Sequence, residues 1–353
     1  RLERKHGSDR WISALRDGDG SIVSSPSDLC SSLSSFYSDL FSASSVDPHV
    51  QADLLENLSS SLSGGQSSLC EGHLTVVEVL SALRGMARRK APGLDGLPME
   101  FYLKFWSVLG SDLVSVLNSS FDSGCLPLSL SQHRGVISLS FKKGDRLDPR
   151  NWRPITLLNV DYKLASRAII GWLLKVIHLL VAEDQTCGVP GRFIGENMAL
   201  LRDVVTFASS SRAPVATLFL DQEKVFDRVD WGFMRSTLVA IGFGPSFVAW
   251  VDLFYRRVQS SVDVNGYVSA FFNLSRGVRQ GCPLSPLLYV LVSEVLVAKI
   301  HCNTRISGLH IPGFPPLSPI LQYADDKSYR SLQCLFRMIN VYEGGSGARL
   351  NVT

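Results

Sequence analysis

The sequence predicts a mixed fold of helices and strands, α/β (α+β) in class, and three observations carry this prediction. Short apolar runs at residues 215–220 and 320–321 precede acidic residues and predict strands. Residues 135–155 hold two strand-like runs around a Lys/Gly turn and predict a hairpin. Apolar residues recur every three or four positions over residues 284–298, after Pro283, and predict a helix.

Composition allows a large core and excludes several protein classes. Of the 353 residues, 45% are hydrophobic, so we expect a mostly globular chain with two or three domains. The seven cysteines include no Cys-x-x-Cys pair, which argues against a disulfide framework or zinc knuckle and favours a reducing compartment. The net charge of +3 is only weak evidence for a polyanionic partner.

No membrane span is expected. The longest apolar stretch, residues 168–181, is interrupted by Lys175 and His178, and a span needs about 18 or more apolar residues. This stretch instead predicts a buried helix. The chain starts at Arg1 rather than Met and stops directly after an ordered-looking segment, so we expect a fragment of a longer gene product.

Residues 1–73 are a serine-rich N-terminal extension without visible chemistry. Apolar residues at helical spacing predict one docked helix there, and they are Leu29, Leu33, Phe36, Tyr37 and Leu40. A second helix is expected over residues 74–90, where Thr75 and Glu78 resemble a capping box. Its predicted apolar stripe consists of Leu74, Val77, Leu80 and Leu83.

The end of this second helix is basic, with Arg88, Arg89 and Lys90 in succession. Two interpretations stay open: a solvated helix end that favours the helix dipole, or a contact to the phosphates of a template. Residues 92–96 then predict a tight loop, and residues 98–109 a further helix.

The hairpin predicted over residues 135–155 carries many cations. They are Lys142, Lys143, Arg146, Arg150 and Arg153. Fixed cations suit a nucleotide triphosphate, because they stabilise the charge that develops on the leaving pyrophosphate. A solvated charged turn is the alternative, and it fits the lysines better than Arg153.

An amphipathic helix is predicted after Asp184, Gln185, Gly191 and Arg192. Its apolar stripe consists of Ile194, Met198, Leu201 and Val205.

The adjacent Asp325 and Asp326 are candidates for chemistry. Neighbouring side chains in a strand point to opposite faces, so both carboxylates reach one site only at a tight turn. We therefore predict a hairpin with these carboxylates at its tip, and a strand beside it that brings Asp221 to the same edge. Three carboxylates around two divalent cations such as Mg²⁺ serve in-line phosphoryl transfer. A surface turn is the alternative, since Asp is common in turns.

Five stretches in order resemble the reverse transcriptases of non-long-terminal-repeat (LINE-type) retrotransposons. They are residues 89–98 (RKAPGLDGLP), 151–155 (NWRPI), 219–227 (FLDQEKVFD), 279–286 (RQGCPLSP) and 323–326 (YADD). The resemblance covers roughly residues 78–353, and five motifs in order are far more specific than any one of them.

The resemblance implies a right-hand polymerase core. Residues 74–214 would hold the fingers and the start of the palm. Residues 215–353 would hold the rest of the palm, built on an antiparallel sheet, with the thumb absent. The implied activity is RNA-directed DNA synthesis, in which a DNA primer 3′-hydroxyl is extended on an RNA template with deoxynucleoside triphosphates. The implied partners are the RNA template and the DNA primer or target, without a membrane. The implied location is intracellular, in a cytoplasmic ribonucleoprotein and the nucleus.

The resemblance also assigns roles to residues. The catalytic residues, which would hold two Mg²⁺ ions with Mn²⁺ as a substitute, are Asp221, Asp325 and Asp326. The nucleotide-binding residues are Arg153 with Lys142 or Lys143, together with Phe226, Gln280 and Gly281. The residues on the template side are Arg88, Arg89, Lys90, Gly191 and Arg192. Phe226 would pack under the nucleotide sugar and clash with a 2′-hydroxyl, and ordinary core packing is its alternative.

Some features depart from the family and support other hypotheses. Val225 stands where relatives usually have alanine, and only residues 327–330 separate Asp326 from the next predicted helix. Asp227 and Asp230 are expected to be cap or surface acids. A second hypothesis is a catalytically decayed, truncated remnant that at most binds RNA. A third is a group II intron-type maturase or a telomerase-like enzyme, but the residues of the first two motifs favour the LINE-type interpretation.

Overall fold

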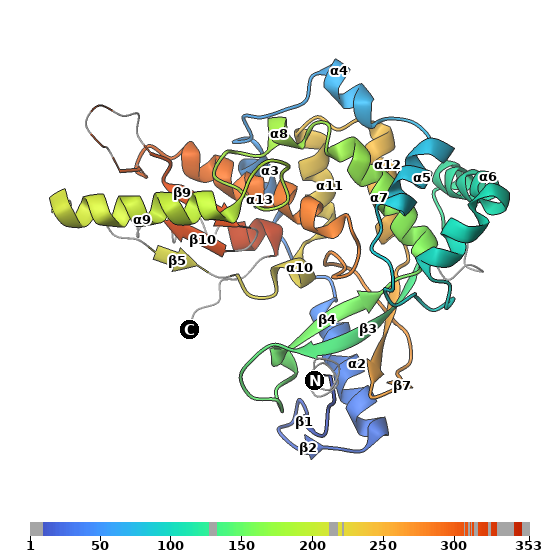
Figure 1. The fold of residues 1–353 in the computed structure, drawn as a ribbon. Helices are drawn as coiled ribbons and strands as arrows, with labels where there is room; N and C mark the ends of the chain where they lie inside the picture. The colour runs from blue at the N-terminus through green and yellow to red at the C-terminus, as the bar shows by residue number, and fades with distance from the viewer. Residues whose placement is uncertain are drawn as a thin grey trace. The chain divides into compact units, whose positions relative to one another are not determined.

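The structure is a computed structural model. It describes residues 10–126, 133–211, 218–220, 222–306, 308–309, 311, 313, 317–323, 326–329 and 342–347. The chain forms two compact units, each assembled from three stretches (Figure 1). The first unit contains Arg1–Ala43, Gly72–Gly171 and Ala249–Ser285, and the second contains Ser44–Glu71, Trp172–Val248 and Pro286–Thr353. The predicted mixture of helices and strands is confirmed, whereas the division into extension, fingers and palm stays a prediction.

The first unit combines a sheet with helices. Its helices are α2 (Pro26–Leu40), α5 (Val76–Arg84), α6 (Met99–Ser123), η3 (Pro149–Asn151) and the larger parts of α7 (Val160–Leu173) and α12 (Pro245–Tyr255). Its strands are β1 (Leu15–Arg16), β2 (Ile22–Val23), β3 (Arg134–Phe141), β4 (Trp152–Leu157), β6 (Gln259–Val264), β7 (Tyr267–Val268) and β8 (Phe272–Asn273).

The larger sheet has the strand order β4-β3-β6-β7, and β8 also pairs with β6. Strands β3 and β4 are antiparallel, with Phe141 opposite Trp152, so the predicted basic hairpin is confirmed. Strands β3 and β6 are parallel, which makes the sheet mixed. Asn265 and Gly266, at φ +55° and +93°, connect β6 to β7, and a two-residue hairpin turn favours this pair because both positions need positive φ.

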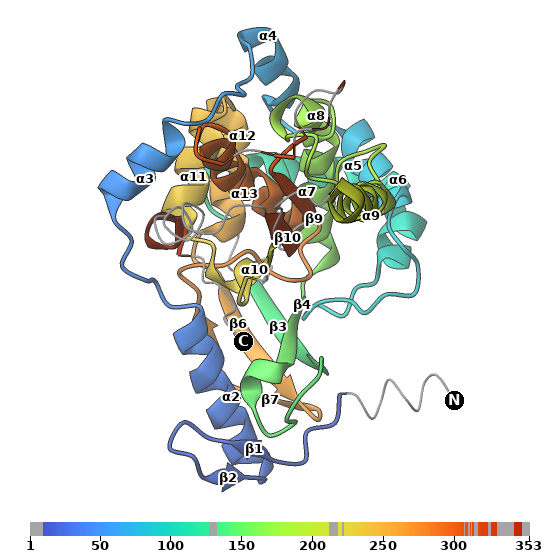
Figure 2. The ribbon, with the colours of Figure 1, turned by 90° about the vertical axis from the view of Figure 1, so that its left-hand side faces the viewer.

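Helix α2 confirms the helix predicted in the N-terminal extension and packs against β6 (Figure 2). The Ser25 side chain caps its first turn by accepting from the Asp28 backbone N–H. Leu29, Leu33 and Tyr37 are buried on one face, and the Tyr37 hydroxyl donates to the Trp152 carbonyl at 3.2 Å. The helix is therefore fixed by its apolar face and by a buried hydrogen bond.

Helix α5 confirms the predicted capping box between Thr75 and Glu78, but two other expectations are wrong. The helix ends at Arg84, with Gly85 as its C-cap, and not near residue 90. Its buried face consists of Val79, Ala82 and Leu83, whereas Val77 from the predicted stripe is 76% exposed. The reason is that positions 79, 82 and 83 share one side of the helix, so only that side meets α6.

The second unit is richer in helices. They are α3 (Pro48–Leu55), α4 (Gly64–Ser67), η1 (Ser68–Cys70), α8 (Ile177–Leu180), α9 (Ile194–Ser211), α10 (Val225–Arg228), α11 (Trp231–Ala240), nearly all of α13 (Ser285–His301), and residues 342–346. Its strands are β5 (Leu218–Leu220), β9 (Ile320–Tyr323) and β10 (Asp326–Tyr329).

The sheet of the second unit has the order β5-β10-β9, and both of its pairings are antiparallel. Tyr323 lies opposite Asp326, which confirms the predicted hairpin, and β5 lies beside it as expected. Phe219 of β5 is 70% exposed. Residues 215–217, and nearly all of the helix predicted after residue 330, lie outside the described residues.

Helix α13 confirms the helix predicted from the apolar series, with Pro286 in its first turn. It is apolar on every side, as is typical of a helix enclosed by other elements. Its buried residues include Leu288, Val292 and Val295. Among the helices of the described residues, none is both long and apolar enough to cross a bilayer.

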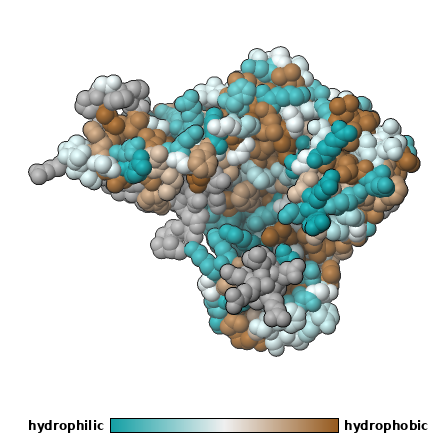
Figure 3. All heavy atoms as spheres, in the orientation of Figure 1, coloured by the Kyte–Doolittle hydropathy of each residue, from teal (hydrophilic) through white to brown (hydrophobic). Residues whose placement is uncertain are grey.

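One further helix prediction needs correction, and another is confirmed. The stretch 168–181 is not one helix: α7 ends at Leu173, and turn hydrogen bonds from Lys175 and Val176 close its end before α8 begins. The helix predicted after Arg192 exists as α9, but the side chains of its apolar stripe are largely in solvent. The exposed fractions are 37% for Ile194, 62% for Met198 and 47% for Val205. Figure 3 shows apolar side chains among hydrophilic ones over α9.

Gly344 and Gly345 lie inside the helical residues 342–346. A Cβ atom on Gly345 would lie 2.6 Å from Leu54 Cδ1 of α3. Gln51 of α3 donates to the Gly345 carbonyl at 2.9 Å. Gly345 therefore permits close helix packing and does not terminate the helix.

Candidate active site

The strands that carry the predicted carboxylates adjoin one another in the second unit. Leu220, the last residue of β5, lies opposite Lys327 of β10. The strand that leads to Asp221 therefore runs beside the strand that begins with Asp326. Asp221 and Asp325 themselves lie outside the described residues, and Asp326 is described by its backbone alone.

Strand β9, which leads to Tyr323, is held on its free edge by the segment 184–186. The Gln322 N–H donates to the Asp184 carbonyl at 2.9 Å, and the Thr186 N–H donates to the Gln322 carbonyl at 3.2 Å. Asn197 of α9 donates its side-chain amide to the same Gln322 carbonyl at 2.8 Å. These contacts fix the first strand of the hairpin to the rest of its unit.

Gly191 and Arg192 precede α9, as the sequence analysis expected. The Arg192 guanidinium donates to the carbonyls of Val181, Ala182 and Gln185, at 3.0 Å for Val181 and 2.9 Å for Gln185. Gly191 has φ +82° and is exposed. Arg192 thus shapes the loop before α9, and its predicted contact with nucleic acid stays a prediction.

Phe226 lies in α10, one turn after the end of β5. Its ring centroid is 4.9 Å from that of Tyr289 on α13. The Tyr289 hydroxyl donates to Gln222 Oε1 at 2.8 Å, and both residues are buried. Between Gln222 and Phe226, Lys224 has a φ of +49°, which is unusual for a residue with a side chain.

Three residues near Phe226 are buried or cap a helix. Val225 is 3% exposed, so its larger side chain is accommodated in the interior. Asp230 is the N-cap of α11 and accepts from the Phe233 N–H at 2.7 Å, as expected of a cap. Asp227 is 1% exposed, so the expectation of a surface acid is wrong for this residue.

The basic hairpin of the first unit presents Lys142 and Arg153 on one face. Ser140 lies opposite Arg153, and Lys142 is two residues further along the same strand face. The Lys142 N–H donates to the Asn151 carbonyl at 2.9 Å and continues the ladder. Within the described part of the chain, Lys142, Lys143 and Arg153 are exposed and have no ion-pair partner. The register therefore favours Lys142 over Lys143 as the companion of Arg153.

The other two arginines of the hairpin are engaged. Arg146 stacks over the rings of Phe141 and Trp152 at 4.4 and 5.1 Å, and Arg150 forms an ion pair with Asp148 at 2.7 Å. These contacts stiffen the turn and leave the charge of Arg153 and the lysines available.

Gln280 and Gly281 lie against the free edge of β4. The Thr156 N–H donates to the Gln280 carbonyl at 2.6 Å. Gly281 has φ +125°, and a Cβ atom there would lie 2.2 Å from the Thr156 carbonyl oxygen. Both observations require glycine at this position. The loop thus contacts β4 at Thr156, three residues after Arg153 on the same strand.

A buried polar cluster supports this loop from within the first unit. The Arg279 guanidinium stacks over the Tyr162 ring at 4.5 Å and donates to the Phe254 carbonyl at 3.1 Å. The Tyr162 hydroxyl contacts Cys282 Sγ at 3.7 Å. Burial raises the pKa of Tyr162 well above its ordinary value of 10, so its hydroxyl stays protonated.

The predicted template-side cations Arg88, Arg89 and Lys90 are all exposed beyond the end of α5. The Arg89 N–H donates to Glu100 Oε1 at 2.8 Å, and this hydrogen bond lowers the pKa of Glu100. A Cβ atom on Gly93 would lie 2.1 Å from Asn159 Oδ1, so the following loop is pressed against the start of α7. Because α5 ends at Arg84, these residues lie too far beyond the helix to favour its dipole, and their contact with template phosphates stays a prediction.

Residues 141–331 match the family of reverse transcriptases (RNA-dependent DNA polymerases). The chain belongs to this family. It is 38% identical over 356 residues to the transposon TX1 149 kDa protein of Xenopus laevis. The alignment covers 99% of this chain and 27% of that protein. It is 26% identical over 250 residues to a Pol polyprotein from retrotransposable element R2 of Popillia japonica, and this alignment covers 70% of this chain and 33% of that protein.

Another relative is the Pol polyprotein from retrotransposable element R2DM of Drosophila melanogaster, which is 38% identical over 207 residues. This alignment covers 59% of this chain and 19% of that protein. The chain thus spans a third or less of each of these relatives. The resemblance to reverse transcriptases of non-long-terminal-repeat retrotransposons is confirmed.

The predicted site residues of this reverse transcriptase fall into two groups. In the first unit, Lys142 and Arg153 share one face of the hairpin, and Gln280 and Gly281 lie against the edge of β4 at Thr156. The second unit places the strands of the carboxylates side by side. Carboxylate oxygens are the ligands that Mg²⁺ prefers in proteins, and the binding of Mg²⁺ by Asp221, Asp325 and Asp326 stays a prediction. Sequence reasoning missed Tyr289, although a tyrosine in an apolar helix signals a hydroxyl that needs a partner.

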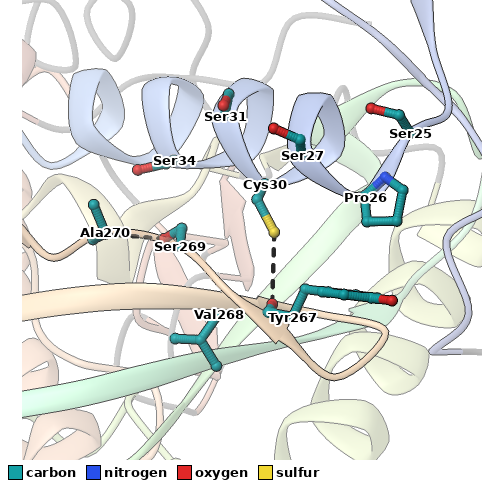
Figure 4. Close-up of a pocket in the computed structure, with 10 residues that line it drawn as sticks. All are labelled: Ser25, Pro26, Ser27, Cys30, Ser31, Ser34, Tyr267, Val268, Ser269 and Ala270. Carbon is teal, nitrogen blue, oxygen red and sulfur yellow. Dashed lines mark hydrogen bonds between the residues drawn. The ribbon is translucent and has the colours of Figure 1, made fainter.

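The reverse transcriptase also contains a pocket away from these residues. It has a volume of about 680 Å³ and lies between α2 and β7 in the first unit (Figure 4). Serine hydroxyls and Cys30 line it, and Cys30 Sγ contacts the Tyr267 carbonyl oxygen at 3.6 Å. The described residues that line this pocket include none of the predicted site residues.

Proposed function

We propose that this chain catalyses RNA-directed DNA synthesis, in which the 3′-hydroxyl of a DNA primer attacks the α-phosphate of a deoxynucleoside triphosphate on an RNA template. One observation carries the proposal: the end of β5 lies beside the start of β10, and Asp221 and Asp326 adjoin these positions in a chain of the reverse transcriptase family. The antiparallel sheet β5-β10-β9 would be the core of the palm.

The carboxylates of Asp221, Asp325 and Asp326 would hold two Mg²⁺ ions, for which Mn²⁺ could substitute. Metal ions bound there would make the primer hydroxyl more acidic and neutralise charge on the pyrophosphate. The residues of the chain have the complementary task of fixing the ligands. Strand pairing of β10 to both neighbours supports rigid placement of the carboxylates.

The first unit supplies the proposed contacts to the nucleotide. Arg153 and Lys142 would bind the triphosphate, because both are exposed cations on one face of the hairpin. Gln280 and Gly281 would line the pocket for the new base pair. The rigid attachment of this loop to Thr156 supports that role.

Discrimination against ribonucleotides would come from Phe226 in the second unit. A ring under the nucleotide sugar leaves no room for a 2′-hydroxyl. Phe226 is half-buried and packs against Tyr289, which supports a fixed ring. Arg88 and Lys90 would contact template phosphates, and the enzyme would act in a ribonucleoprotein and in the nucleus.

Primer extension on an RNA template tests the proposal. We expect extension by the wild-type protein in Mg²⁺, and extension at background level for the Asp325→Asn/Asp326→Asn double variant. The matched control is Asp112→Asn, since Asp112 is an exposed acid on α6. Extension by the double variant at the wild-type rate, or none by a wild-type protein that binds primer–template, would contradict the proposal.

A further inference from the structure

Tyr289 makes two contacts with the short segment that joins the proposed metal-binding strand to the proposed nucleotide-selecting ring. Its hydroxyl donates to Gln222 Oε1 at 2.8 Å, and Gln222 directly follows Asp221 in the chain. Its ring packs on Phe226 at a centroid distance of 4.9 Å and an interplanar angle of 45°. One side chain of α13 therefore touches both ends of this segment.

The platform under these contacts is rigid. Tyr289 is 2% exposed, and its helix neighbours Leu288 and Val290 are at most 1% exposed. Helix α13 has 17 residues and buries all of its sides, so the position of the tyrosine is set by close packing. It can therefore act as a fixed reference for other parts of the unit.

The segment above it consists of short elements. Helix α10 has only four residues, and β5 has three. Lys224 between them adopts a left-handed conformation, which is strained for a residue with a Cβ atom and persists only where surrounding contacts enforce it. The ion pair between Glu223 and Arg228, at 3.1 Å, closes the turn but does not attach it to a helix outside it. The contacts to Tyr289 supply such an attachment.

We infer that Tyr289 is a positioning residue for sugar selection: its ring sets the height of Phe226, and its hydroxyl anchors the chain next to Asp221. This inference rests on the proposed function and adds a residue and a division of labour to it. The ring would affect the selection of deoxynucleotides over ribonucleotides, and the hydroxyl would affect kcat.

The test compares variants in the ratio of kcat/KM for a deoxynucleotide to kcat/KM for the matching ribonucleotide. Tyr289→Ala removes the support of Phe226, and we expect the ratio to fall about tenfold to a hundredfold, because small displacements of a positioned group have effects of this size. Tyr289→Phe keeps the ring, so the ratio should stay unchanged. Its kcat should fall about two- to tenfold, because the hydrogen bond to Gln222 is lost.

Tyr342 offers a matched control in the same unit. It is also a buried tyrosine, and its hydroxyl donates to the Val292 carbonyl of α13 at 3.4 Å, at a different place on that helix. Tyr342→Ala should destabilise the fold without a change in the ratio. If Tyr289→Ala does not fold, Tyr289→Leu retains most of the buried volume and allows the same comparison.

The outcomes separate this inference from the proposed function. A ratio that falls in Tyr289→Ala but not in Tyr342→Ala supports the inference. Phe226→Ala combined with Tyr289→Ala should then be no less selective than Phe226→Ala alone. An active wild-type protein whose ratio is unchanged in Tyr289→Ala overturns the inference and leaves the proposed function intact. A wild-type protein without polymerase activity overturns both.

Discussion

Gly281 shows how one residue fixes the loop of the proposed base-pair pocket. Its φ of +125° and the 2.2 Å distance from a hypothetical Cβ atom to the Thr156 carbonyl oxygen leave no room for a side chain. We therefore expect Gly281→Ala to lower the free energy of unfolding by about 2 kcal/mol or more, since strain and overlap add. Urea denaturation followed by circular dichroism measures this change, and the KM for the nucleotide should rise.

Gly266→Ala is the control for backbone strain alone. Gly266 also has a positive φ, +93°, but nothing lies within 4 Å of a Cβ atom there. Its substitution should cost about 1 kcal/mol, in line with strain without overlap, and should leave the KM for the nucleotide unchanged. Equal destabilisation by the two substitutions would argue against the close approach of Gly281 to Thr156.

His301 gives the second unit a pH-dependent contribution to stability. Its Nε2 atom lies 2.7 Å from Asp184 Oδ2, and this hydrogen bond raises the pKa of the histidine above its ordinary value of 6.5. Below pH 6.5 the stabilisation is fully present, and it is lost as the pH rises through the raised pKa of the folded state. Stability should therefore decline as the pH rises above 6.5, and more in the wild-type protein than in His301→Gln.

Thermal unfolding across this pH range measures the difference. His49, which has no partner of this kind among the described residues, provides the control variant His49→Gln. Parallel pH profiles for the wild-type protein and His301→Gln would show that the ion pair does not contribute.

At the scale of elements, α9 is attached to the β9–β10 hairpin mainly through polar contacts. The Asn197 amide donates to Gln322 O at 2.8 Å and to Thr186 Oγ1 at 3.1 Å, while Val204 is the fully buried apolar residue of the helix. We expect Asn197→Ala to destabilise the unit by about 1–3 kcal/mol, because a buried carbonyl loses a donor, and to lower kcat in primer extension.

Asn57→Ala is a suitable comparison. Asn57 also donates its amide to a backbone carbonyl, that of Asp53 at 2.7 Å, but in an exposed place near α3. It should have little effect on either quantity. A kcat for Asn197→Ala equal to that of Asn57→Ala would mean that α9 does not position β9.

Local patterns were sufficient for elements whose partners are close in sequence. The short apolar run before two adjacent aspartates predicted the β9–β10 hairpin, and the Thr75–Glu78 pair predicted the start of α5. The β6–β7 hairpin was missed although Asn265-Gly266 is a strong turn signal. The side that α9 turns to the interior was not predictable either, because an apolar stripe does not specify what covers it.

At the scale of the whole molecule, the motifs identified the family correctly and placed the carboxylate strands side by side. The parallel pairing of β3 with β6 joins residues more than a hundred positions apart, and no local pattern encodes such a register. The same limit applies to the site. The sequence named Phe226, but not the tyrosine on α13 that supports it, because the contact joins segments that are distant along the chain.

The exposed stripe of α9 has a consequence for the colloidal behaviour of the protein. Phe193, Ile194, Met198 and Val205 expose between 37% and 67% of their surface. Apolar surface of this kind is driven together by salts that are excluded from protein surfaces, such as sulfate. Concentrated ammonium sulfate should therefore salt out the protein early.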